Sequence, residues 1–99
     1  MISLRRKNLD LATEVVQDLK DLEQFGLSLP EKRLHKIRGT ALWELRSAWR
    51  HSIARTLFFE EGRRVIVVTH IFQKKTDSIP TTDLKRALER MERWLEERR

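Results

Sequence analysis

Apolar residues recur at helical spacing near the start of the chain. The stretch "LDLATEVVQDLKDLEQFG", residues 9–26, has charged and polar residues between its apolar ones. Its apolar set is Ala12, Val15, Val16, Leu19 and Leu22. This spacing predicts an amphipathic helix over 8–25. Asn8 is placed to cap the start of that helix, and Gly26 is placed just beyond its end.

A second amphipathic helix is predicted at the other end, in "TTDLKRALERMERWLEERR". Its apolar stripe consists of Leu84, Ala87, Leu88, Met91 and Leu95, and Trp94 widens it. Thr81 or Thr82 is expected to cap the first turn. Asp83 suits the positive end of the helix dipole.

Three strands are predicted between the helices. They are "ALWELR" at 41–46, "SIARTLFF" at 52–59 and "RRVIVVTHIF" at 63–72, the most apolar run in the chain. Short connections at 47–52 and 60–62 favour an antiparallel three-strand meander. The segment "EKRLHKIRG" at 31–39 is expected to be a short helical turn or a loop. We therefore expect one α+β domain over 1–99, with the meander packed against both helices.

Length and composition restrict the class of protein further. The chain has 99 residues and no cysteine, which suits one small domain without disulfides or thiolate metal sites. The N-terminus "MISLRRKNLD" lacks the apolar run of a secretory signal. No apolar run approaches the roughly 18 residues that a membrane span needs. We expect a cytoplasmic protein.

The net charge of +6 favours an anionic partner. Residues 31–75 hold eleven basic and four acidic side chains, a net of +7, so this block contains all of the excess. Concentration of positive charge in one part of a small domain is typical of a nucleic-acid interface.

The aromatic and histidine residues leave several alternatives open. Trp43 alternates inward and is expected in the core, whereas Trp49 either covers the core or stacks on a base. His35 is expected to be solvated. His70 fits a structural histidine better than a catalytic one, and for His51 the two alternatives are about equal. No pair of histidines or carboxylates has metal-ligand spacing, and no cofactor is expected.

Topology predicts that the cations gather at one end of the meander. The end of the first strand and the start of the second are neighbours, and the end of the third lies at the same edge. This places together Arg46, Arg55, Lys74, Lys75 and, in the loop, Arg50 and His51. Such a cluster could bind an RNA backbone or stabilise a pentacovalent phosphate.

Several motifs resemble one known family. "LWELR", "IARTLFF", "GRRVIVVTHIFQKKT", a proline and "LKRALERMERW", together covering roughly residues 8 to 96, are similar to the HigB-like branch of the RelE/ParE toxin superfamily. Its members are small basic toxins of type II toxin–antitoxin modules. The resemblance implies a RelE-like fold and a ribosome-associated mRNA endonuclease that needs no metal. It also implies a neutralising antitoxin, often a helix-turn-helix protein.

The resemblance implies roles for particular residues. Arg46 and Arg55 match basic residues on the concave face of the sheet, and Lys75 or Lys74 matches the basic residue near the scissile phosphate. From the residues themselves, His51 is the best-placed base for the 2′-hydroxyl proton. The expected catalytic set is His51, Lys74, Lys75 and Arg55. The expected RNA-binding set is Arg46, Arg50, Arg38, Lys36 and Trp49.

Three departures from the family keep a second function open. The chain contains no tyrosine, Glu44 stands where RelE has a lysine, and the first family strand is expected to be missing or reduced. The alternative is a non-catalytic, degenerate toxin-like binder, or a ParE-like inhibitor of DNA gyrase. The shortened N-terminus also leaves the edge of the 64–72 strand open. We therefore expect a homodimer through that edge, or its pairing with an antitoxin strand.

Overall fold

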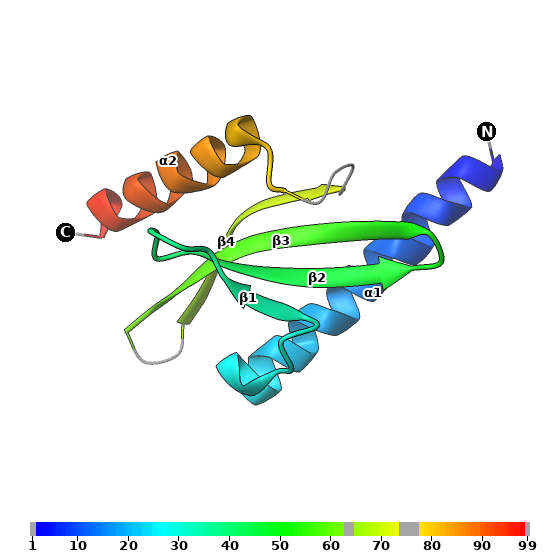
Figure 1. Ribbon diagram of the computed structural model, residues 1–99, viewed down its shortest axis with the longest axis horizontal. Coiled ribbons are helices and arrows are strands. Elements are labelled where there is room, and N and C mark those ends of the chain that lie inside the picture. Colours follow the sequence, from blue (N-terminus) through cyan, green and yellow to red (C-terminus); the bar gives the residue numbers. More distant parts are fainter. Residues whose placement is uncertain (1, 63–64, 74–77, 99) are drawn as a thin grey trace.

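The computed structural model describes residues 2–62, 65–73 and 78–98 as an α+β domain. Helix α1 spans Ile2–Phe25, the 3₁₀ turn η1 Gly26–Ser28, and helix α2 Thr81–Glu97. The strands are β1 (Leu34–Lys36), β2 (Trp43–Trp49), β3 (Ser52–Glu61) and β4 (Val65–Gln73). Helices α1 and α2 lie on either side of the sheet (Figure 1). No helix within the described part of the chain is long and apolar enough to cross a membrane.

The sheet has one strand more than predicted. Its order is β1-β2-β3-β4, and each neighbouring pair is antiparallel. The three expected strands form in sequence, but the expected turn or loop at 31–39 contains β1. Leu34 lies opposite Leu45 and is 4% exposed, because it packs into the core. A strand of three residues is too short to show a period of two, so the sequence pattern did not reveal it.

The two faces of the sheet are both covered. We call the side of Ala54 and Phe58 the α1 face, because these side chains pack with residues of α1. We call the side of Leu57 and Phe59 the α2 face, because they pack around Ala87 of α2. Side chains alternate between the faces along a strand. Strand β3 is therefore buried on both sides and is the centre of the fold.

Both helices begin differently from the prediction. Helix α1 begins at Ile2, so Asn8 lies inside it and is not its N-cap. The residues before Asn8 include no glycine or proline, and nothing in "ISLRRKN" stops the helix from extending. Gly26 does follow the end of α1, and its φ of 62° is the left-handed conformation that glycine favours there. Pro80 occupies the N-cap of α2, without a side-chain cap from Thr81 or Thr82.

A paired arginine anchors α1 to the segment before β1. Arg33 Nη2 donates to Asp18 Oδ1 at 2.7 Å and to Asp21 Oδ2 at 2.9 Å. These contacts raise the pKa of Arg33, with the hydrogen bond to Asp21 as the largest cause. Asp18 is 6% exposed, so Arg33 compensates a buried carboxylate. One cation of the basic block therefore has a structural part, in which it holds α1 against the segment before β1.

Arg33→Ala should lower the free energy of unfolding by about 1–3 kcal/mol, because Asp18 would stay buried without its partner. Urea unfolding followed by circular dichroism measures the effect. The matched control is Arg38→Ala, which removes the same charge from an exposed turn and should change stability by less than about 0.5 kcal/mol. Equal effects in the two variants would show that the Arg33 contacts do not stabilise the fold.

The first hairpin is tighter than expected. Strand β2 continues to Trp49, which pairs with Ser52, so only Arg50 and His51 form the turn. Arg50 has a φ of 54°, in the left-handed region that such two-residue turns use. Trp49 packs against a cluster of Leu11, Val15 and Ala54 on the α1 face. The structure therefore supports a core position for this ring, and base stacking by Trp49 stays a prediction.

Candidate nucleic-acid interface

Arg46 and Arg55 face each other on neighbouring strands. They are Cα partners in the β2–β3 pair, as the topology predicted. Glu44 lies between their side chains: Oε1 is 2.7 Å from Arg46 Nε, and Oε2 is 3.1 Å from Arg55 Nη1. We call these three residues the arginine–glutamate triad. It carries a net charge of +1 on the α2 face of the sheet.

The members of the triad differ in their access to solvent. The side chains of Arg55 and Glu44 are 1% and 3% exposed, while that of Arg46 is 36% exposed. Arg46 is therefore the member that a phosphate can contact directly. Arg55 compensates the charge of the buried Glu44 carboxylate. Glu44 in turn holds the Arg46 side chain in place by accepting a hydrogen bond from Arg46 Nε. This makes Arg55 and Glu44 positioning residues for Arg46.

A pocket of about 210 Å³ opens beside the triad. His35, Lys36, Ile37 and Ile79 complete its lining. His35 lies opposite Glu44 in the β1–β2 pair and is half-buried, so its expected solvation is wrong. Its Nε2 atom is buried and has no hydrogen-bond partner among the described residues. The prediction missed His35 because it did not include β1.

The remaining candidates lie around this pocket and at the hairpin turn. Arg50 places its guanidinium 6.0 Å from the Trp49 ring centroid, and His51 beside it is exposed. Lys36 donates to the backbone oxygen of Thr40 and lies 6.0 Å from the Trp43 ring.

Arg38 is exposed in the turn between β1 and β2. Lys74 and Lys75 fall outside the described residues. Within the described ranges, no group of three or more acidic or histidine side chains could hold a metal ion.

His70 has a structural position. Its Nε2 atom lies 2.7 Å from Asp83 Oδ1, and its Nδ1 atom lies 3.0 Å from Arg90 Nη1. A guanidinium only donates hydrogen bonds, so Nδ1 of His70 accepts from Arg90. The N–H group of His70 is then at Nε2, and it donates a hydrogen bond to Asp83. Arg90 also donates to the backbone oxygen of Thr69 at 2.9 Å. The network ties α2 to β4, and it supports the structural alternative for His70.

Fold and charge together define a small, basic α+β domain with paired arginines on one face of an antiparallel sheet. The chain belongs to the family described as Phage derived protein Gp49-like (DUF891), whose model matches residues 4–92. This is a family of RelE-like toxins related to toxin–antitoxin systems. No curated protein and no solved structure matches the chain significantly.

Proposed function

We propose that the chain is the toxin of a type II toxin–antitoxin module and cleaves mRNA on the ribosome without a metal ion. The observation that carries this proposal is the arginine–glutamate triad. A half-exposed arginine, held by a buried carboxylate, is fixed in place before substrate arrives. Such a preorganised cation stabilises negative charge that develops in a transition state. Membership in a RelE-like toxin family supports the same function.

The proposed reaction uses the RNA as its own nucleophile. The 2′-oxygen forms a bond to the adjacent phosphorus, the bond from phosphorus to the 5′-oxygen breaks, and a 2′,3′-cyclic phosphate results. A base takes the 2′-hydroxyl proton, and an acid returns a proton to the leaving 5′-oxygen. Arg46 holds the phosphate and offsets its growing charge. His51 is the proposed base, and Lys74 and Lys75 are the further proposed cations.

The partners of this function are proposals of the same kind. Ribosome-bound mRNA would lie along the face that carries Arg46, with Arg50, Arg38 and Lys36 contacting its backbone. A cognate antitoxin, in the HigB-like branch a helix-turn-helix protein, would neutralise the toxin. A RelE-like arrangement with a reduced first strand is part of this proposal. The sheet of the structure has four antiparallel strands, in the order β1-β2-β3-β4.

Programmed ribosomes test the proposal directly. Ribosomes carrying a defined mRNA should be cut when the purified protein is added in a buffer with EDTA, and the 5′ fragment should end in a cyclic phosphate. The Lys74→Ala, Lys75→Ala double variant should lose cleavage while its thermal melt stays unchanged. Intact mRNA at an excess of folded wild-type protein would exclude the nuclease.

One observation favours the non-catalytic alternative. Arg55, which the sequence placed in the catalytic set, is buried to 1% exposure and cannot reach RNA directly. If the chain is not catalytic, its basic face would bind nucleic acid or another anionic surface without cleaving it. Growth arrest with intact mRNA and inhibited DNA gyrase would support the ParE-like form of this alternative.

A further inference from the structure

Strand β4 is one of the two edge strands of the sheet, and β1 is the other. Strand β4 is the last strand in the order and pairs with β3 alone among the described elements. The Thr69 oxygen accepts from Arg90 of α2, where the β3–β4 register shifts by one residue. The other outward backbone N–H and C=O groups of β4 can pair with another strand. The natural occupant of such an edge is an extended polypeptide segment.

The α1 face of β4 is apolar and only partly covered. Helix α1 packs mainly over β2 and β3, so the side chains of β4 extend past it. Val68 is 41% exposed and Ile71 is 48% exposed. Ile71 lies opposite Thr56, which places it on the α1 face, and Val68 faces Leu19 of α1 across a pocket. A strand added to β4 would place every second side chain against these two residues.

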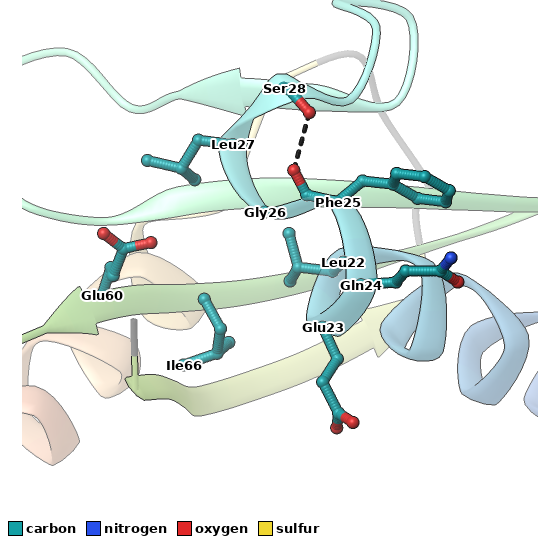
Figure 2. Close-up of a pocket in the computed structure, with 9 residues that line it drawn as sticks. All are labelled: Leu22, Glu23, Gln24, Phe25, Gly26, Leu27, Ser28, Glu60 and Ile66. Carbon is teal, nitrogen blue, oxygen red and sulfur yellow. Dashed lines mark hydrogen bonds between the residues drawn. The ribbon is translucent and has the colours of Figure 1, made fainter. Parts of the chain in front are cut away.

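Two adjoining hollows, which share Glu23 and Ile66 in their linings, lie between α1 and β4. The first, about 300 Å³, is lined by Leu19, Glu23, Ile66 and Val68. The second hollow, about 310 Å³, is lined by the end of α1, by η1, and by Glu60 and Ile66 of the sheet. Glu23 of α1 is part of this lining too. Figure 2 shows Leu22 and Leu27 in this second hollow, with Glu60 and Ile66 beside them and Phe25 directed away. We call the two together the α1–β4 groove.

The charge of this groove is opposite to that of the protein as a whole. The lining of the groove includes two carboxylates, Glu23 and Glu60, and no lysine or arginine, in a chain of net charge +6. Glu23 and Glu60 are exposed at the groove and have no ion-pair partner among the described residues. An apolar groove lined by two exposed carboxylates favours a cationic occupant, and it disfavours a nucleic acid.

We propose that the α1–β4 groove binds an extended segment of a partner protein that pairs with β4 as an added strand. The segment carries apolar side chains at alternate positions, which pack on Val68 and Ile71. It also carries a lysine or arginine that reaches Glu23 and Glu60. The inference is independent of the proposed RNA cleavage, because the triad lies on the α2 face and the groove on the α1 face.

A second copy of this chain fits the groove less well. Its β4 could supply the backbone and apolar side chains, but Val65–Gln73 contains no lysine or arginine to pair with Glu23 and Glu60. His70, the one residue of β4 that can carry positive charge, uses both ring nitrogens in contacts with α2. Charge complementarity therefore favours a different, basic chain.

Synthetic strands test the inference on the intact protein. The probes are capped nine-residue peptides of alternating valine and threonine, with a lysine at the first or last position. Matched peptides carry glutamate at the same position. By NMR titration, one lysine peptide should bind at least about fivefold more tightly than its glutamate counterpart. Its binding should shift the amide signals of β4.

Charge reversal supplies the matched controls. Glu23→Lys should weaken the lysine peptide at least about fivefold and strengthen the glutamate peptide. Glu92→Lys, the same change on the exposed side of α2, should alter neither, and both variants should keep wild-type RNA cleavage. Equal effects of the two reversals, or no lysine peptide bound at about 1 mM, would overturn the inference. A dimer by sedimentation that the peptides cannot dissociate would also overturn it, in favour of a second copy.

Discussion

Replacing Glu44 by alanine should lower the free energy of unfolding by about 3–5 kcal/mol, because it removes the carboxylate that the buried guanidinium of Arg55 contacts at 3.1 Å. Arg55 is 1% exposed and cannot turn to water without opening the sheet. A domain of this size has a total stability of about 5–15 kcal/mol. The variant should therefore be close to unfolded at 37 °C. Urea unfolding at lower temperature measures the loss.

The matched control removes both buried charges together. The double variant Glu44→Leu, Arg55→Met keeps similar volumes and leaves no buried charge uncompensated, so it should recover most of the lost stability. Arg46 would lose a partner but is 36% exposed and can be hydrated. A loss below about 1 kcal/mol in the Glu44→Ala variant would show that water reaches the pair, contrary to the structure.

The elements that the sequence predicted are those with long periodic patterns. Both helices and the three strands of the meander repeat their apolar positions over several turns or pairs. Strand β1 spans three residues, and its one buried apolar side chain, Leu34, sets no period. The early start of α1 was missed because Asn8 is a favourable cap, yet the residues before it also allow a helix.

The sequence predicted which residues of the site pair across the strands, but it did not predict how deeply they are buried. Antiparallel topology placed Arg46 beside Arg55, and the register confirms it. Alternation also put Leu42, Glu44 and Arg46 on one face, a pattern that resembles a solvated side of a sheet. In the structure α2 and the segments around β1 cover part of this face. Alternation reports which residues share a face, but it does not report what packs on that face.

The second large effect is expected at Arg46. Arg46→Ala removes the exposed cation of the triad and leaves the contact between Glu44 and Arg55 in place, so the fold should be retained. If Arg46 stabilises the phosphorane, the rate of cleavage of ribosome-bound mRNA should fall by about 10²–10³. The loss should appear in kcat at saturating ribosome concentration, since binding is shared with the other cations of the basic block.

Two variants separate this role from general electrostatic attraction. Arg38→Ala removes the same charge from an exposed turn, so it should leave kcat near the wild-type value. It should also reduce the slope of the salt dependence of RNA binding by about one. Arg46→Lys keeps the charge but loses the Nε contact with Glu44, so its kcat should lie between those of wild type and Arg46→Ala. If Arg38→Ala lowers kcat as strongly as Arg46→Ala, the triad has no special part in the reaction, and the basic face acts only by attracting RNA.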